Sequence, residues 1–381
     1  MKFLVLGAGA QGSAAAFDLL RRPEVEGVIL ADQRVDHPKP FLKPYIGKRL
    51  ELRALNAKDE PAVQALMGGV DGVLCALPYY FNAPMTELAL ESGCHFCDLG
   101  GNTAIVLQQR ELDQAAQAAG LSVIPDCGLA PGMVNILAQD GMDSLDQTTS
   151  VELFVGGLPQ HPKPPLNYQV VFSLEGVIDY ATTPVLVLAG GKVTEVEPLG
   201  DLETLTFEGL GDLEAFNTAG GISLMPYRYQ GQVDRMVYKT LRYPGNTYLM
   251  RAMRDIGLFD EEPIDVDGQQ VVPRRSFIAA VSPHLQNPEG DDLVVLRVDV
   301  RGTRNGKAAG VRYELIDYYD AEHGVTAMMR STGYSLAITA LMQADGRVER
   351  MGVCTPDEAM PADAYLAELK RSGIEVKRLE L

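Results

Sequence analysis

The chain has 381 residues, of which 46% are hydrophobic, and its 51 acidic against 33 basic residues give a formal net charge of −18. This length exceeds what one core normally holds, so we expect two domains. The negative charge argues against nucleic acid and anionic membranes as partners, because phosphate binding needs clustered Lys and Arg. No segment approaches the roughly 20 uninterrupted apolar residues of a membrane span, and we expect a cytoplasmic protein.

The first apolar run leads directly into a glycine-rich turn. Residues 3–12 read FLVLGAGAQG, which places Gly7, Gly9 and Gly12 in Gly-x-Gly-x-x-Gly spacing. An amphipathic segment follows, and the next apolar run ends on Asp32. This order of strand, turn, helix and acid-ended strand is the fingerprint of dinucleotide binding. The glycines allow, in turn, a tight turn, the approach of a pyrophosphate and close packing of the helix on the sheet.

The same motif predicts which cofactor is bound. The helix that begins near Ala10 and Gln11 would present its free N–H groups and positive end to the phosphates. Asp32 can accept hydrogen bonds from both ribose hydroxyls and would repel the 2′-phosphate of NADP, so NAD is favoured over NADP. Arg34 could stack on adenine or pair with a 2′-phosphate.

Strand-like and helix-like patterns alternate through the first 127 residues, which predicts a Rossmann-type doubly wound parallel sheet of the α/β class. The predicted strands cover residues 2–8, 25–32, 49–57, 70–78, 94–100 and 121–128. The predicted helices are Gln11–Arg22, Pro61–Met67, Pro84–Ser92 and Leu107–Ala119.

Strand ends in a sheet of this kind gather at the cofactor crevice. The residues there that we expect to contact the cofactor are Leu77, Pro78, Asn82 and Gly100. Asp98 and Asp126 are the candidates for proton transfer, with Cys127 and Tyr79 beside them, because no histidine lies in these strand ends. Each acid could instead cap a glycine-containing turn, and Cys127 could be a buried thiol.

The five cysteines are an odd number and fit a reducing compartment. Cys94 and Cys97 have CxxC spacing, but they lie in a predicted strand, where residues three apart point to opposite faces. No second Cys or His pair has ligand spacing, so no metal is predicted.

After Gly128 the pattern changes to longer β-type runs with period-two alternation and no regular helices between them. These runs cover residues 149–159, 184–199, 234–245, 292–306 and 308–320. They predict an α+β second domain built on a largely antiparallel sheet. The chain then reads as a long apolar helix over 326–346, a helix that starts at Pro361 and a final strand over 374–381.

We therefore expect a dinucleotide-binding domain over 1–128, a substrate-binding and dimerisation domain over 129–325, and a C-terminal segment, 326–381, that folds back onto the first domain. Homo-oligomerisation through the second domain is expected on general grounds.

Three segments resemble the saccharopine dehydrogenase family: residues 77–103, which contain CDLGGN, residues 125–138, which begin PDCGLAPGM, and residues 239–246, KTLRYPGN. The first two together are most similar to its lysine 6-dehydrogenase branch. The resemblance covers the first domain almost wholly and the second in patches, notably 156–182. It implies NAD(P)-dependent oxidation at a carbon that bears nitrogen. In this branch L-lysine loses hydride from its ε-carbon to NAD, and hydrolysis gives ammonia and a semialdehyde that cyclises to a piperideine carboxylate.

A lysine-like substrate brings a carboxylate, for which Arg242 is the best partner because a guanidinium pairs with it through two parallel bonds. Thr240 shares its strand face, whereas Lys239 and Tyr243 face oppositely and are expected to be structural. Arg242 could also be a surface arginine at a strand end.

Several residues near the predicted domain junction are weaker candidates. Asn135 follows a helix start at Pro131 that could hold the substrate or the cofactor carboxamide, or could be a rigid connector. Asn102 could line the crevice as Asn82 does, and Tyr168 could close it from above. Asn246 stands where family members often have His or Phe, so the substrate pocket differs there.

Two other functions remain open. A saccharopine or carboxynorspermidine-type reductase would need further basic residues, and Arg228, Arg235, Arg274 and Arg275 could serve. The other alternative is a non-catalytic NAD-binding regulatory protein.

Overall fold

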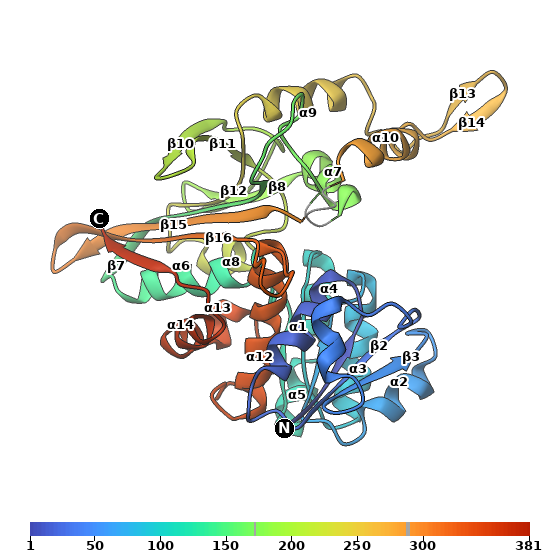
Figure 1. The fold of residues 1–381 in the computed structure, drawn as a ribbon. Coiled ribbons are helices and arrows are strands. Elements are labelled where there is room, and N and C mark those ends of the chain that lie inside the picture. Colours follow the sequence, from blue (N-terminus) through green and yellow to red (C-terminus); the bar gives the residue numbers. More distant parts are fainter. Residues whose placement is uncertain (171–172, 287–289) are drawn as a thin grey trace.

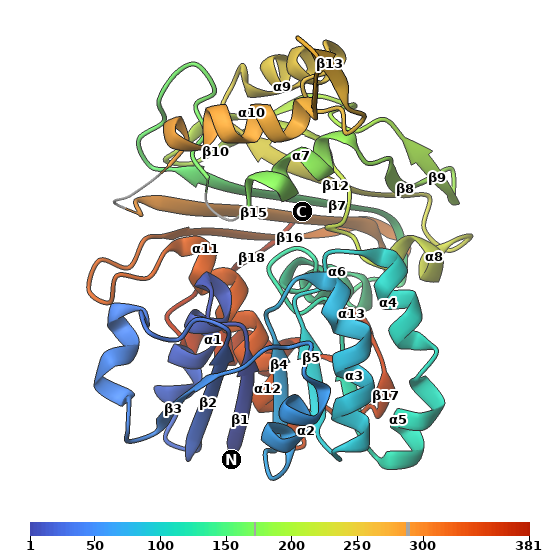
Figure 2. The same ribbon diagram turned by 90° about the vertical axis from the view of Figure 1, so that its right-hand side faces the viewer.

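The structure is a computed structural model that describes residues 1–170, 173–286 and 290–381. Two sheets divide the molecule into two layers (Figures 1 and 2). In Figure 2 the strands of the first sheet run upward from the N-terminus, so their carboxyl ends lie at the junction with the second sheet.

The first sheet has, among the described residues, seven parallel strands in the order β17-β6-β5-β4-β1-β2-β3. They are β1 (Lys2–Leu6), β2 (Gly27–Asp32), β3 (Leu50–Ala54), β4 (Gly72–Cys75), β5 (His95–Asp98), β6 (Ser122–Ile124) and β17 (Gly352–Val353). Apolar clusters cover both faces of this sheet, as parallel strands require. The predicted Rossmann-type fold is confirmed.

The helices of this domain are α1 (Ala10–Leu20), α2 (Glu60–Met67), α3 (Asn82–Glu91), α4 (Thr103–Arg110) and α5 (Asp113–Ala119), with 3-10 turns at η1 (Pro40–Tyr45) and η2 (Tyr79–Phe81). The predicted single helix Leu107–Ala119 is wrong. The Asn102 side chain starts α4 earlier by accepting from the N–H groups of Ala104 and Ile105. The chain breaks at Leu112, and the Asp113 carboxylate then accepts from the Val353 N–H of β17 at 2.8 Å.

The second sheet has the order β10-β11-β12-β7-β15-β16-β18, with β8 and β9 beside β12. Its strands are β7 (Gln147–Pro159), β8 (Val185–Ala189), β9 (Lys192–Val196), β10 (Glu203–Phe207), β11 (Gly211–Asn217), β12 (Arg235–Arg242), β15 (Asp292–Arg304), β16 (Lys307–Tyr318) and β18 (Lys377–Glu380). The largely antiparallel sheet is confirmed, and its one parallel pair in the described chain is β12 with β7.

The expectation of no regular helices between these strands is wrong. The domain contains α6 (Met133–Asp143), α7 (Leu174–Thr182), α8 (Met225–Tyr229), α9 (Asn246–Asp255), α10 (Pro273–Val281) and the 3-10 turn η3 (Ser282–His284), and a hairpin of β13 (Ile264–Val266) and β14 (Gln269–Val271) projects from it (Figure 1). The Ser173 side chain caps α7. Glu214, from β11, caps α9 by accepting from the N–H groups of Gly245 and Thr247. The second cap is tertiary, so periodicity could not reveal it.

The tail lies against both sheets. A continuous helical stretch, α11 (Ala327–Met329), η4 (Arg330–Tyr334) and α12 (Ser335–Ala344), packs on α1, and α13 (Pro356–Ala359) and α14 (Ala362–Arg371) follow. A Cβ on Gly333 would lie 2.7 Å from the Ala14 Cβ, so this close approach requires glycine. The tail does not fold back as one unit, because β17 extends the first sheet whereas β18 extends the second. None of the helices in the described ranges is long and apolar enough to cross a bilayer.

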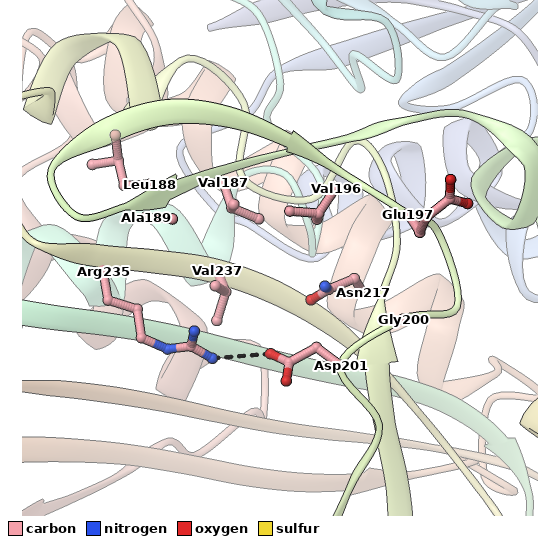
Figure 3. Close-up of a pocket in the computed structure, with 10 residues that line it drawn as sticks. All are labelled: Val187, Leu188, Ala189, Val196, Glu197, Gly200, Asp201, Asn217, Arg235 and Val237. Carbon is pink, nitrogen blue, oxygen red and sulfur yellow. Dashed lines mark hydrogen bonds and ion pairs between the residues drawn. The ribbon is translucent and has the colours of Figure 1, made fainter.

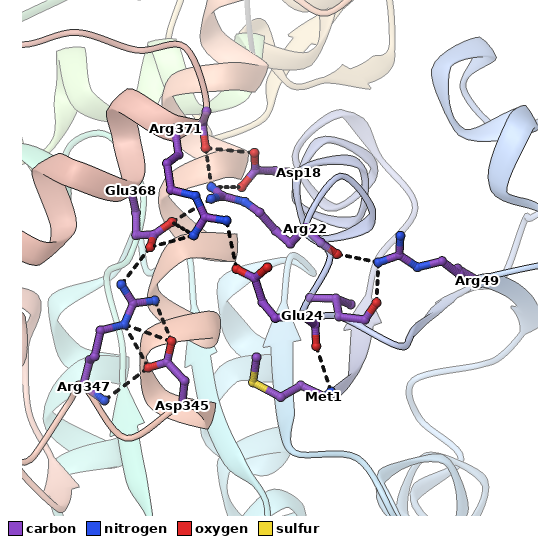
Figure 4. Close-up of polar contacts among 11 residues, drawn as sticks. Met1, Asp18, Arg22, Glu24, Arg49, Asp345, Arg347, Glu368 and Arg371 are labelled. Carbon is purple, nitrogen blue, oxygen red and sulfur yellow. Dashed lines mark hydrogen bonds and ion pairs between the residues drawn. The ribbon is translucent and has the colours of Figure 1, made fainter.

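A buried cluster of charged side chains connects α14 to α1 (Figure 4). Arg22, which is 4% exposed, donates through Nη1 to Glu368 at 2.6 Å and through Nη2 to Asp18 at 2.9 Å. The Ser372 hydroxyl donates to the other Asp18 oxygen at 2.8 Å. Among the described residues, Asp18 has Arg22 as its one ion-pair partner, whereas Glu368 also pairs with Arg347 and Arg371.

Arg22→Ala should lower the free energy of unfolding by about 3–5 kcal/mol, because it leaves the buried Asp18 carboxylate without its cation. Arg371 also pairs with Glu368, but its side chain is 47% exposed. Arg371→Ala should therefore cost less than about 1 kcal/mol. Urea denaturation of both variants measures the difference, and equal losses would contradict the assignment.

Candidate functional site

The glycine-rich turn has the geometry that a bound dinucleotide needs. Gly7 has φ of +101°, and a Cβ there would lie 2.7 Å from the Ala76 carbonyl oxygen. A Cβ on Gly12 would lie 1.9 Å from the Gly7 oxygen, so α1 can approach the turn only with glycine at this position. A Cβ on Gly9 would meet no atom within 4 Å. Gly9 therefore faces open space at the start of α1, where a pyrophosphate fits.

Neighbouring polar groups support this fit. The Asp32 carboxylate accepts from the Ala8 N–H at 2.8 Å and from the Arg34 N–H at 3.0 Å, which holds it beside the turn. The Gln11 Oε1 atom is buried without a hydrogen-bond partner in the described chain. Ala10 and Arg34 are exposed. Three features of the turn therefore suit a dinucleotide: the Gln11 oxygen can accept a hydrogen bond, Asp32 lies at the expected ribose position, and no atom covers the backbone at Gly9.

The predicted residues after β4 divide into two groups. Leu77 is half-buried, and Pro78 and Tyr79 are exposed, so these three remain available at the sheet edge. Asn82 is buried, and its Oδ1 lies 3.4 Å from the Cys75 Sγ. The expectation that the Asn82 side chain contacts the cofactor is therefore wrong, because this side chain points into the sheet.

Asp98 and Asp126 lie together at the ends of β5 and β6, and both are buried. Asp98 Oδ1 accepts from the N–H groups of Gly100 at 2.7 Å and Asp126 at 3.4 Å, and its Oδ2 accepts from Gln109 Nε2 at 2.7 Å. A Cβ on Gly100 would lie 1.6 Å from an Asp126 carboxylate oxygen. Gly100, predicted to contact the cofactor, is therefore required as glycine by its contact with Asp126.

Asp126 receives a hydrogen bond from the second domain. The Ser223 hydroxyl, in the segment between β11 and α8, donates to Asp126 Oδ2. Burial raises the pKa of Asp98 to about 6 and that of Asp126 to about 7, against an ordinary 3.8. The charge of Asp98 adds to the rise at Asp126. The raised pKa values bring the ionisation of this carboxyl pair close to neutral pH.

Gln109 and Ser223 were not predicted from the sequence. Gln109 lies on a helix that the sequence places only approximately, and Ser223 lies in an irregular segment far from Asp126 along the chain. Neither position carries a motif, so no sequence signal identifies them.

Cys127 is not available for proton transfer, contrary to the prediction. It is 1% exposed, and its Sγ donates to the Ile124 carbonyl at 3.0 Å. Burial raises the pKa of its thiol well above the ordinary value. Cys94 and Cys97 belong to different apolar clusters on opposite faces of the sheet, as the strand geometry predicts.

Asn135 was predicted to contact the substrate, but its carboxamide is occupied by protein groups. Its Oδ1 accepts from the Gly132 N–H at 2.7 Å, and its Nδ2 donates to the Ile222 carbonyl at 3.1 Å. Asn135 therefore connects the start of α6 to the segment that carries Ser223.

Arg242 is buried on the second domain without a carboxylate partner. It is 3% exposed, and its guanidinium donates to Tyr180 and to the Leu241 carbonyl and lies 4.7 Å from the Tyr168 ring centroid. No Asp or Glu of the described residues lies within ion-pair distance of it. The alternative of a surface arginine is wrong. A desolvated, uncompensated cation favours an anionic ligand.

The neighbours of Arg242 on β12 follow the predicted alternation. Thr240 is buried, and its hydroxyl lies 2.7 Å from that of Thr218. Lys239 faces oppositely and pairs with Asp201 and Glu203, and the Tyr243 hydroxyl donates to the Pro159 carbonyl. Both Lys239 and Tyr243 thus have structural contacts.

The other basic residues considered for a larger substrate are mostly paired. Arg228 pairs with Asp357, Arg235 with Glu152 and Asp201, and Arg274 with Asp179 and Glu261. Arg275 is exposed on α10.

Two pockets in the structure have one of these basic residues in their lining. One, of about 280 Å³, includes Arg235, Val237 and Asn217 in its lining (Figure 3), and the alternation along β12 places it on the face opposite Arg242. The second, of about 290 Å³, lies between α4 and α8 and is lined in part by Arg110 and Leu224. These residues directly follow Gln109 and Ser223 in the sequence, but neither Gln109 nor Ser223 lines the pocket.

Between about pH 4 and 7 the folded chain holds more protons on Asp98 and Asp126 than the unfolded chain does, because both pKa values are raised on folding. Their contribution to the free energy of unfolding therefore falls as pH rises through this window. Asp126→Asn keeps the shape and tolerates the left-handed backbone, and it should be more stable relative to wild type at pH 8 than at pH 5. Urea denaturation at the two pH values measures this difference, which would be absent if Asp126 titrated normally.

Comparison with family models assigns both halves of the chain. Residues 3–124 match the saccharopine dehydrogenase NADP binding domain, and residues 128–374 match the saccharopine dehydrogenase C-terminal domain.

Among curated relatives, the mitochondrial alpha-aminoadipic semialdehyde synthase of Mus musculus is 25% identical over 98% of this chain and 47% of that protein, so the chain spans about half the length of this relative. A saccharopine dehydrogenase [NADP(+), L-glutamate-forming] of Pyricularia oryzae is 27% identical over 85% of the chain and 87% of its own length.

Solved structures show the same fold. The saccharopine dehydrogenase (L-Glu forming) of Saccharomyces cerevisiae superposes with a TM-score of 0.82 at 19% identity, covering 100% of this chain and 99% of that one. A homospermidine synthase of Legionella pneumophila, solved in complex with NAD, gives a TM-score of 0.69 at 11% identity, covering 100% and 91%. From the two family matches, which together span both sheets, we conclude that the chain belongs to the saccharopine dehydrogenase family.

Proposed function

We propose that the protein is a nicotinamide-dinucleotide-dependent oxidoreductase that oxidatively deaminates an amino acid, with NAD as cofactor and L-lysine, oxidised at its ε-carbon, as substrate. The observation that carries the proposal is the buried Arg242 guanidinium, which has tyrosine neighbours and no carboxylate partner in the described chain. An amino acid carboxylate would complete its pairing.

The carboxyl pair supplies the chemistry that an amine substrate needs. A lysine ε-ammonium has a pKa of about 10.4 and must lose a proton before its carbon can lose hydride. Asp126, whose pKa is about 7, is suited to accept that proton near neutral pH. After this proton has passed to solvent, water adds to the iminium carbon and gives a proton to the pair, which returns it to the nitrogen of the carbinolamine. The C–N bond then breaks, and the nitrogen leaves as ammonium with the proton of the hydroxyl group.

The bound dinucleotide would supply the hydride acceptor. Overall, the ammonium form of lysine, NAD⁺ and water give the semialdehyde, ammonium, NADH and one proton. Gly7, Gly9 and Gly12 would hold the pyrophosphate, and Asp32 the adenosine ribose. Asp32 supports NAD, whereas the family model and the fungal relatives are named for NADP.

A second candidate is a saccharopine or carboxynorspermidine-type dehydrogenase. The names of the relatives favour it, since they include saccharopine dehydrogenases and a carboxynorspermidine synthase of Vibrio cholerae, which is 22% identical over 100% of this chain. Its extra charged groups would need cations beyond Arg242, and Arg228, Arg235 and Arg274 already have acidic partners.

The test is absorbance at 340 nm of the purified protein with NAD or NADP and L-lysine, saccharopine, ornithine or a diamine at mildly alkaline pH. We expect reduction of NAD with lysine, with one ammonia released for each NADH formed. Turnover with saccharopine alone would support the second candidate. Dinucleotide binding without turnover on any amine would indicate a regulatory protein.

Arg242→Met should raise the KM for the amino acid by about 100-fold, because the charge-assisted pairing with the carboxylate is lost. The Kd of the dinucleotide should change less than about 3-fold, since Arg242 lies on the second domain. The matched control is Arg235→Met, a cation on the opposite face of the same strand. Equal weakening of amino acid and dinucleotide binding by Arg242→Met would contradict the assignment.

A further inference from the structure

Two residues with left-handed backbone meet at the domain junction. Asp126 has φ of +65° and Ser223 has φ of +55°, and neither is glycine. Both are buried, and the Ser223 hydroxyl donates to the Asp126 carboxylate. Such conformations cost about 1 kcal/mol or more each and persist only where the surroundings fix them. The hydrogen bond thus joins two backbone segments held in conformations that they would not adopt alone.

The segment that carries Ser223 is fixed by contacts on both sides. At its start, the Thr218 hydroxyl bonds with that of Thr240 on β12. A Cβ on Gly221 would lie 2.4 Å from the Tyr238 ring, so this glycine lies directly on the ring. At its end, Asn135 Nδ2 donates to the Ile222 carbonyl at 3.1 Å and lies 3.3 Å from the Met225 Sδ. Ser223 is therefore placed on Asp126 by α6 and β12 together.

The two carboxyl groups differ in what surrounds them. Asp98 accepts from Gly100, Asp126 and Gln109, all of the first domain. For Asp126, the side-chain donor is the Ser223 hydroxyl, which the second domain supplies. Three donors favour the charged form of Asp98, whereas the charged form of Asp126 is favoured by Ser223 across the domain junction and, to a smaller extent, by the Gly101 backbone N–H.

We propose, on the basis of the proposed function, that Ser223 is a positioning residue that stabilises the ionised Asp126 carboxylate and thereby lets this group act as the proton acceptor when the two domains are in contact. The hydroxyl itself takes no part in bond making. The hydroxyl donates a hydrogen bond to Asp126, and this bond stabilises the ionised carboxylate more than the protonated carboxyl group.

Other groups around Asp126 oppose its ionisation. Asp98 and Asp357 both raise its pKa by their charge, and burial contributes most. Arg228 pairs with Asp357 at 2.7 Å, which partly offsets the second of these charges. The Cys127 thiol, next in the chain, is neutral because burial raises its pKa. Loss of the Ser223 hydroxyl should therefore raise the proton affinity of Asp126.

The test is a titration of the carboxyl groups by ¹³C NMR, in protein labelled at the aspartate carboxyl carbon and free of substrate. The Asp126 signal is identified by its absence in Asp126→Asn. In Ser223→Ala the Asp126 midpoint should rise by about one pH unit, the effect of losing one hydrogen bond to a charged group. Ser223→Gly removes the same hydroxyl but accepts the left-handed backbone without strain, and it should give the same shift.

The matched control is Ser144→Ala at the other end of α6, where the hydroxyl donates to the Gly141 carbonyl at 2.7 Å. This variant should leave the Asp126 midpoint unchanged. An unchanged midpoint in Ser223→Gly, or the same shift in Ser144→Ala, would overturn the proposal.

Measurements of turnover distinguish a failure of this proposal from a failure of the proposed function. If the protein deaminates lysine, the acid limb of its kcat/KM profile should move upward in Ser223→Gly by the same amount as the NMR midpoint. An acid limb that stays in place while the midpoint moves would overturn the role of Asp126 as proton acceptor. Absence of turnover on every amine would overturn the proposed function and leave the NMR result standing.

Discussion

The desolvation of two carboxyl groups at the junction of the sheets is the constraint on which the candidate site depends. Asp98 and Asp126 end adjacent strands and are almost completely removed from water. A buried carboxylate is tolerated only when hydrogen bonds replace its hydration. Those bonds come from Gln109 on α4, from the Gly100 backbone N–H and from Ser223 on the second domain. Of these bonds, the one from Ser223 to Asp126 crosses the junction between the domains.

Arg242 is the reverse case, because it is a buried cation without an anionic partner among the described residues. It is a buried cation whose described neighbours are tyrosines and a carbonyl, and it has no ion pair with any Asp or Glu in the parts of the chain that the structure describes. Under the function proposed above, the substrate carboxylate would pair with Arg242 and its amine would lie at the carboxyl pair. The segment that links Thr218 to Ser223 connects the strand of Arg242 to the carboxyl pair, because it bonds to β12 at one end and to Asp126 at the other. The tail extends both sheets, through β17 and β18, and so helps to fix this arrangement.

The parts of the site that follow from local geometry could be predicted. Gly7, Gly9 and Gly12 have their roles because a turn and a helix start have fixed shapes, and the structure gives each of them the expected surroundings. Asp98 and Asp126 were predicted to lie together because parallel strands end at one edge, and they do. Arg242 and Thr240 share a strand face because side chains alternate. The error at Asn135 arises because its partner, the Ile222 carbonyl, lies in a distant segment of the chain. Asn82 and Cys127 bond to near neighbours, and the sequence did not show how completely packing buries them.

By itself, the sequence determined the succession of strands and helices in the first domain, the position of the dinucleotide turn and the strand faces of the second sheet. These are properties of periods of two and 3.6 residues and of single backbone conformations, and they need only near neighbours. Tertiary structure alone decided the break between α4 and α5, the cap of α9 by Glu214, and the donors that reach the carboxyl pair. Each of these depends on hydrogen bonds between separate segments of the chain, and no local pattern encodes such bonds.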